Sequence, residues 1–158
     1  MHWECSPSLS TTQDSRPSTL RLYGLAAALP SLVLLLAASA VHPRQSGYGT
    51  HEQLLLPPCG FLARTGWPCV TCGVTTSVSA MAHGQWGLAL RAQPFGIVLF
   101  LAAALLAAAG SLQVLTARDV IGVFRPGLGW VVLAVVGLLG GWICKVGAGV
   151  WSGQLPLH

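Results

Sequence analysis

Three cysteines and one histidine lie within a short stretch of the chain, between two long apolar segments. The cysteines are Cys59, Cys69 and Cys72, and His51 lies eight positions before the first of them. Prolines and glycines between these residues favour tight turns, which can bring sulfur atoms together. Thiolate sulfur and imidazole nitrogen are the usual ligands of structural zinc, so these four residues form a candidate Cys3His metal site.

Two other chemistries suit the same cysteines. Cys69 and Cys72 lie at the start of a predicted helix, whose N-terminus stabilises a thiolate, and Cys59 could then act as the resolving thiol of a redox enzyme. In an oxidising compartment, the same cysteines could instead form a structural disulfide. The sequence leaves metal binding, redox catalysis and a disulfide open.

His83 is a poor fourth ligand for geometric reasons. A continuous helix from Cys72 to His83 would separate the two residues by about 16 Å, which is more than one zinc ion can bridge. We therefore expect His83 to bond to Ser79 or to a backbone carbonyl. The remaining cysteines are predicted to lie outside the cluster, Cys5 as a free thiol in the N-terminal tail and Cys144 as a small packing residue in a helix.

The composition indicates a membrane protein. Only 8% of the 158 residues are charged, against roughly 25% in soluble domains, and the mean hydropathy is +0.67. A soluble fold could not cover so apolar a core with so few charges. The net charge of +4 comes from scattered Lys and Arg residues without the basic run typical of nucleic-acid binding, so we expect no nucleic-acid partner.

Three charge-poor intervals are each long enough to cross a bilayer as a helix, which needs about 20 residues. We predict transmembrane helices over residues 20–42, 94–116 and 127–150, with a kink at Pro30 in the first. Ala38-Ser39-Ala40 also suits a signal-peptide cleavage site, so a cleaved first segment is the alternative to a retained span.

The remaining segments differ from the spans in composition. Residues 1–18 are rich in Ser, Thr and Pro and predict a disordered tail. Residues 43–72 form a Cys/His loop full of turn-forming residues, and residues 73–91 show the apolar stripe of an amphipathic or re-entrant helix. The predicted fold class is therefore an all-α integral membrane protein with three transmembrane helices, and a Cys/His-containing re-entrant or interfacial segment and helix between the first two.

Small residues in the third span predict close helix packing. Gly137 and Gly141 form a small-xxx-small pair that suits contact with another helix, within this chain, in a second copy or in a different membrane protein. The lipid bilayer is the other expected partner. Arg16 and Arg21 before the first span, against Arg44 after it, favour a cytoplasmic N-terminus in the cell (inner) membrane.

The cysteine pair is part of a longer motif. Its stretches are, in order, Gly49-Thr50-His51-Glu52-Gln53-Leu54, Cys69-Val70-Thr71-Cys72-Gly73-Val74-Thr75-Thr76, His83-Gly84-Gln85 and Gln93-Pro94. This pattern resembles the bacterial membrane-protein family called domain of unknown function 2752, over about residues 47–100. Val70 and Thr76 stand where that family often has proline and arginine. The resemblance implies a small integral membrane protein and brings no activity with it.

The residues do not define a reaction. The chain has four acidic residues, too scattered for paired carboxylates, and its spans lack the Asp, Glu or His that mark an ion pathway. We therefore expect a structural or accessory component of a membrane assembly rather than an enzyme. The alternatives are a membrane thiol-disulfide oxidoreductase that uses Cys69 and Cys72, and a transporter subunit.

Overall fold

A computed structural model describes residues 17–124 and 127–153, and within these ranges the regular structure is helical, without a strand. The long helices are α1 (Pro17–Ala40), α5 (Pro94–Thr116) and α6 (Leu128–Trp151). A short helix, η2 (Ile121–Phe124), lies between α5 and α6. Residues 41–93, between α1 and α5, form what we call the cap, which contains η1 (Thr50–Leu54), α2 (Gly60–Thr65), α3 (Val74–Ala82) and α4 (Trp86–Ala92).

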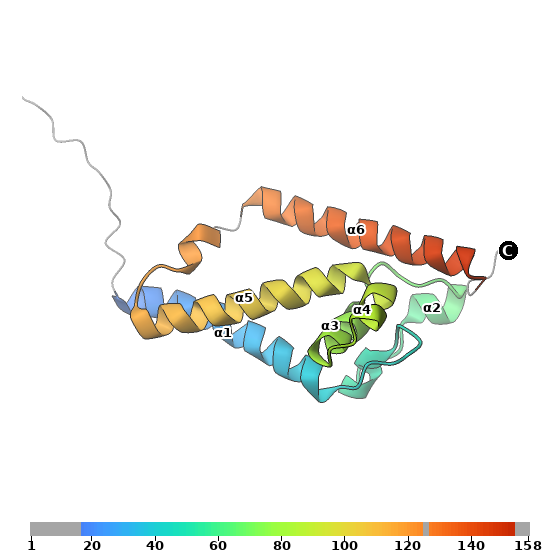
Figure 1. Cartoon of the computed structure of the whole chain (residues 1–158), viewed down its shortest axis with the longest axis horizontal. Coiled ribbons are helices and arrows are strands. Elements are labelled where there is room, and N and C mark those ends of the chain that lie inside the picture. Colours follow the sequence, from blue (N-terminus) through green and yellow to red (C-terminus); the bar gives the residue numbers. More distant parts are fainter. Residues whose placement is uncertain (1–16, 125–126, 154–158) are drawn as a thin grey trace, which may run out of the picture.

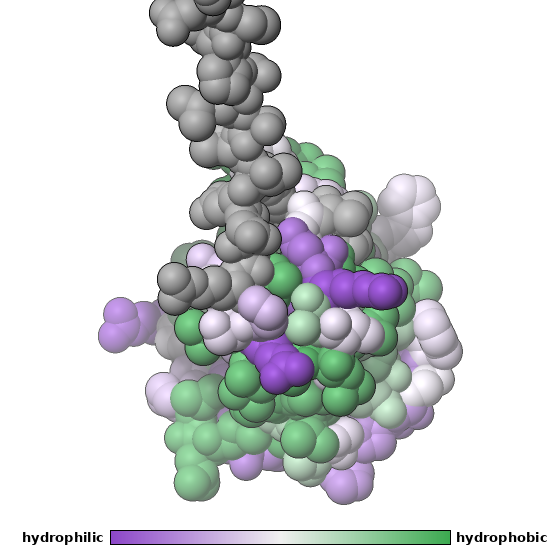
Figure 2. All heavy atoms as spheres, turned by 90° about the vertical axis from the view of Figure 1, so that its left-hand side faces the viewer, coloured by the Kyte–Doolittle hydropathy of each residue, from purple (hydrophilic) through white to green (hydrophobic). Residues whose placement is uncertain are grey.

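The long helices confirm the predicted fold class. Each of the three is long and apolar enough to cross a membrane. Their bounds lie within three residues of the predicted spans 20–42, 94–116 and 127–150, and α1 continues through Pro30. Figure 2 views the end of the molecule at which α1 begins, and it shows hydrophobic residues over much of the surface, as a protein surrounded by lipid requires.

Helices α1 and α5 lie side by side in opposite directions (Figure 1). Two glycines permit the close approach, because a Cβ atom at Gly24 would lie 2.9 Å from the Gly110 carbonyl oxygen. A Cβ atom at Gly110 would likewise lie 2.7 Å from the Gly24 carbonyl oxygen. Ala28 of α1 and Ala103 and Ala107 of α5 are buried. In lipid, such van der Waals packing of small residues holds helices together.

Helix α6 is the least buried of the three, and Figure 1 shows it on the side of α5 away from α1. Gly141 is its buried residue, and a Cβ atom there would lie 3.2 Å from Gln93 Nε2. The other half of the predicted small-residue pair, Gly137, faces the ring of Phe95. Both glycines therefore pack within this chain.

The predicted helix over residues 73–91 is instead two helices, α3 and α4. Gly84 adopts a φ angle of 70°, a left-handed conformation that glycine takes without steric cost. The amides of Gly84 and Gln85 donate to the carbonyls of Met81 and Ala80 at 3.1 and 2.8 Å, which closes α3 with a Schellman motif. As a result α4 returns along α3, and the Ser77 hydroxyl donates to the Ala89 carbonyl at 3.0 Å.

The other predicted segments also differ in detail. Residues 1–16 of the predicted tail lie outside the described residues, whereas Pro17 and Ser18 already belong to α1. The predicted loop over residues 43–72 contains η1 and α2. Both of these helices are short; η1 packs against α3, whereas α2 has no buried residue.

Candidate metal-binding thiol cluster

The three predicted cysteines converge in the cap. Cys69 Sγ lies 3.5 Å from Cys59 Sγ and 3.3 Å from Cys72 Sγ, and all three sulfurs lie within 4.8 Å of one another. All three are free cysteines. Four tetrahedral ligands with zinc–sulfur bonds of about 2.3 Å would separate neighbouring sulfurs by about 3.8 Å, so small movements suffice for one ion to bind all three. We call Cys59, Cys69 and Cys72 the thiol cluster.

A short helix and a turn bring these sulfurs together. Cys59 is the residue before α2, and two prolines ahead of it keep the chain extended. Helix α2 ends at Gly66, whose φ angle of 73° turns the chain back towards the other two cysteines. The Cys72 amide then donates to the Cys69 carbonyl at 3.0 Å, which closes the Cys-x2-Cys turn.

Gly73 links the thiol cluster to the rest of the fold. Its φ angle is 95°, and it is the N-cap residue of α3. A Cβ atom at this position would overlap the Ala92 carbonyl oxygen and would lie 2.6 Å from Lys145 Nζ and 2.7 Å from the Gly47 carbonyl oxygen. The loop before η1, the end of α4 and α6 thus meet at a point where only glycine fits.

Cys69 and Cys72 differ in acidity. Burial raises the pKa of Cys69, but the Thr71 hydroxyl and backbone N–H and the two neighbouring thiols can donate to its thiolate, which lowers the pKa from 9.0 to about 7. Burial, together with the interactions with Cys69 and Cys59, raises the pKa of Cys72 to about 12. Within the Cys-x2-Cys pair, Cys69 is therefore the more acidic thiol and Cys72 the less acidic one.

His51 lies beside the thiol cluster but is not part of the group of three converging ligand atoms. Its Nε2 lies 3.2 Å from the Pro57 carbonyl oxygen, and because a carbonyl can only accept, Nε2 is the donor in this bond. His51, Cys59 and Cys72 line one cavity of about 250 Å³. A histidine that donates one ring N–H to a carbonyl is in the usual state of a metal ligand, and the role of His51 as fourth ligand stays a prediction.

Lys145 contacts the site, although no sequence prediction assigned it there. It lies inside α6, and its Nζ donates to the Cys72 carbonyl at 3.0 Å and to the Gly47 carbonyl at 3.3 Å. The same Nζ lies 5.2 Å from the centre of the Tyr48 ring, a cation–π contact. The signal in the sequence was a single lysine in an otherwise uncharged span, which is costly unless the ammonium finds partners.

Buried hydroxyls hold η1 against α3. Thr76, at the position where the resembling family often has arginine, is buried, and its Oγ1 lies 2.8 Å from Oγ1 of buried Thr50. The Arg44 amide donates to Thr50 Oγ1 at 3.1 Å, and the Arg44 side chain pairs with Glu52 at 2.8 Å. The motif residues before the first cysteine are thereby fixed next to the cavity that contains His51.

The remaining histidine and cysteine predictions have separate outcomes. His83 Nδ1 lies 2.9 Å from the Ser79 carbonyl oxygen, which confirms the predicted backbone bond. Cys144 does not belong to the thiol cluster, as predicted, but it is exposed on α6 rather than packed. The prediction for Cys5 falls outside the described residues.

The fold and the cluster define the class: a helical protein with three helices able to cross a membrane and a cap that brings three thiols together. Residues 59–107 match the model of a family described as "Protein of unknown function (DUF2752)", which confirms the family resemblance found in the sequence. The match begins at Cys59, includes Cys69, Cys72, α3 and α4, and ends within α5. No curated protein and no solved structure matches the chain.

Proposed function

We propose that this chain is a structural or accessory subunit of a membrane assembly whose cap is stabilised by one zinc ion bound to Cys59, Cys69 and Cys72. The observation that carries the proposal is the convergence of three sulfurs within 4.8 Å. A disulfide or a dithiol redox pair needs only two sulfurs, whereas a Cys3His zinc site uses three. Zinc is also the divalent metal whose structural sites most often combine cysteine with histidine.

His51 is the fourth ligand in this proposal. The bond from its Nε2 to the Pro57 carbonyl supports the role, since it leaves Nδ1 as the ring nitrogen that would face a metal, as does the cavity that it shares with Cys59 and Cys72. For Nδ1 to reach an ion bound by the three sulfurs, the imidazole would have to rotate or η1 would have to move, since His51 is not among the converging ligand atoms. The same cavity gives a metal ion in solution access to the sulfurs.

The location and partners belong to the same proposal. The apolar long helices support a multi-pass membrane protein, and the family resemblance supports the bacterial inner membrane as its location. The arginines before the first span, Arg16 and Arg21, support a cytoplasmic N-terminus, which would put the cap on the outer side. Its partners would be the bilayer and a further membrane protein or a second copy. Gly140 and Gly147 of α6, where a Cβ atom would meet nothing within 4 Å, leave room for such a helix to approach.

Metal analysis of the detergent-purified full chain tests the proposal. We expect about one zinc ion per chain, because three thiolates and an imidazole saturate a tetrahedral site. Cys72→Ser should lose the metal, and His51→Ala should keep it more weakly, so that a chelator removes it faster than from the native chain. Cys144→Ser, which changes an exposed cysteine outside the cluster, is the matched control and should retain the full content. A disulfide within the cluster, or a metal-free chain with three titratable cluster thiols, would refute the zinc site.

A membrane thiol-disulfide oxidoreductase is the second candidate, because of the unequal acidities of the cysteine pair. Cys69, with a pKa of about 7, has the properties of an attacking thiolate, and buried Cys72, with a pKa of about 12, those of a resolving thiol. In such a reaction the Cys69 thiolate would attack a disulfide of a partner protein and release one partner thiolate. Cys72, deprotonated as it attacks Cys69 Sγ, would then form a Cys69–Cys72 disulfide and release the second partner thiolate. The cysteine pair is thereby oxidised while the partner protein is reduced.

The pH dependence of alkylation separates the two candidates. In metal-free protein carrying Cys5→Ser and Cys144→Ser, the alkylation rate of Cys69 should rise with pH and reach half its maximum near pH 7, because the thiolate is the reacting form. Peptide mass spectrometry measures the modification of each cysteine. Under the zinc proposal, added zinc protects Cys69 throughout this range. An unprotected Cys69, together with a partner disulfide trapped by Cys72→Ser, would favour the oxidoreductase.

A further inference from the structure

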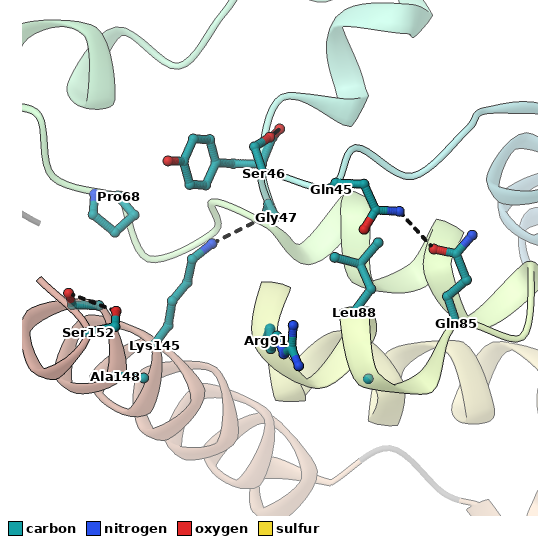
Figure 3. Close-up of a pocket in the computed structure, with 13 residues that line it drawn as sticks. Gln45, Ser46, Gly47, Pro68, Gln85, Leu88, Arg91, Lys145, Ala148 and Ser152 are labelled. Atoms are coloured by element: carbon teal, nitrogen blue, oxygen red, sulfur yellow. Dashed lines mark hydrogen bonds between the residues drawn. The ribbon is translucent and has the colours of Figure 1, made fainter. Parts of the chain in front are cut away.

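A second cavity, of about 680 Å³, lies at the end of α6 that reaches the cap. Residues of α6, of α4 and of the loop before η1 line it, and Figure 3 shows Lys145 extending from α6 towards Gly47 at its edge. Its volume falls within the range of about 300–1,000 Å³ that is typical of ligand sites. No step of the proposed zinc function uses this cavity.

The charged groups of the cavity are all cationic. Arg91 and Lys145 line it, and no Asp or Glu is among its lining residues. Within residues 17–124 and 127–153, the one ion pair joins Arg44 to Glu52, so Arg91 has no acidic partner there. Lys145 uses two of its three N–H donors on the carbonyls of Gly47 and Cys72, which leaves a third donor for a ligand.

The other polar groups of the cavity are neutral. Gln45 and Gln85 bond to each other at 3.4 Å, and Figure 3 shows this pair across from Lys145. The Ser152 hydroxyl donates to the Gly149 carbonyl at 3.3 Å. Two cations beside neutral hydrogen-bonding groups, without a carboxylate, suit an anion with several acceptor oxygens, such as a phosphate group.

The surroundings of the cavity suit a lipid. It lies beside the C-terminal end of α6, where a helix that crosses a membrane would reach the membrane surface. Exposed aromatic residues flank it, Trp151 at the end of α6 and Trp86 on α4, at 95% and 58% exposure. Tryptophan prefers the boundary between lipid and water. Leu90, on the same short helix as Arg91, is also exposed and could contact an acyl chain.

We propose that this cavity binds the phosphate group of an anionic phospholipid, with Arg91 and Lys145 as its charged donors. Basic pockets beside transmembrane helices attract such headgroups electrostatically. A soluble phosphate ion would need the same hydrogen-bond donors. The position of the cavity beside the end of α6 favours the lipid. Because Lys145 also binds the Cys72 carbonyl, a bound headgroup would lie next to the thiol cluster without contacting a sulfur.

Native mass spectrometry of the full chain, released from micelles with added phosphatidylglycerol or phosphatidylcholine, measures this binding. We expect retention of phosphatidylglycerol in preference to phosphatidylcholine. Arg91→Gln should weaken retention about tenfold, because it removes charge-assisted hydrogen bonds from an exposed residue that the fold does not need. Arg91→Lys should keep most of the binding. Arg64→Gln, which removes an exposed cation of α2 outside the cavity, is the matched control and should change it by less than about twofold.

Two further measurements define the site and the source of the anion. Ala148→Trp should block the cavity without changing any charge, and should reduce lipid retention as strongly as Arg91→Gln. Inorganic phosphate should not displace the lipid, and in a thermal-shift assay it should not raise the melting temperature of the chain. If phosphate stabilises the native chain, Arg91→Gln abolishes this stabilisation and no lipid is retained, the site would bind a soluble anion. That result would overturn the proposed lipid ligand. Equal losses in Arg91→Gln and Arg64→Gln, or equal retention of the two lipids, would overturn the site itself.

Discussion

Gly73→Ala should disrupt the cap and abolish metal binding in a chain that keeps every cysteine. A side chain at a φ angle of 95° costs about 1–2 kcal/mol, because its Cβ meets the neighbouring backbone. The larger cost comes from clashes with other segments of the chain, since this Cβ would overlap the Ala92 carbonyl oxygen and press on Gly47 and Lys145. Overpacking of this kind adds about 1–3 kcal/mol where side chains can adjust, and two of these three neighbours are backbone atoms.

Gly84→Ala is the control that separates the two costs. Gly84 has a φ angle of 70°, but a Cβ atom there would meet nothing within 4 Å. Both variants therefore carry the conformational cost, and Gly73→Ala alone carries the clash. We expect Gly73→Ala to lower the melting temperature in detergent and the zinc content far more than Gly84→Ala. Equal effects on both quantities would show that the contacts of Gly73 do not organise the site.

The second large effect is expected from the cysteines themselves. Cys59→Ser, Cys69→Ser and Cys72→Ser should each lower the abundance of the protein in the membrane several-fold and to similar extents. The reason is that removal of one thiolate removes most of the stability supplied by a structural metal, whichever of the three cysteines is replaced. Quantitative immunoblotting of membrane fractions against an unaffected membrane protein measures the abundance.

Cys144→Ser provides the matched comparison, because this cysteine is exposed on α6 and stands apart from the cluster. Its abundance should equal that of the native chain. Normal abundance of Cys69→Ser alone would contradict a structural role. In that case the low pKa of Cys69 would be the property that matters, and the redox interpretation would take precedence.

The parts of the fold that were predictable depend on local patterns. Charge-free runs of about the bilayer thickness located the three long helices, since their length and composition alone decide whether they can cross. The convergence of the thiol cluster was also predictable, because turn-forming residues separate the cysteines over a short distance. The bond from His83 to the Ser79 carbonyl follows from helical spacing of four residues.

The parts that escaped prediction depend on contacts between distant segments. Lys145 is 73 positions from Cys72, whose carbonyl it binds, and nothing local in either segment indicates the pairing. Gln93 is fully buried, and its Nε2 lies 3.4 Å from the carbonyls of Val70 and Leu138 in two other elements. From the sequence it is merely the residue before the proline that opens α5. The break between α3 and α4 was more nearly predictable, because glycine, here Gly84, is the residue that most often ends a helix.

The attachment of α6 has a consequence for the order of biosynthesis. The ribosome makes α1, the cap and α5 before α6, and these earlier elements can pack together without it. The carbonyls that receive Lys145, at Gly47 and Cys72, are correctly placed only after the cap has folded. Until then the Lys145 ammonium, near the end of α6, lacks both carbonyl partners and has to reach water at the membrane surface instead. Docking of the last helix therefore depends on a completed cap, and a chain whose cap has not folded leaves Lys145 without these two acceptors.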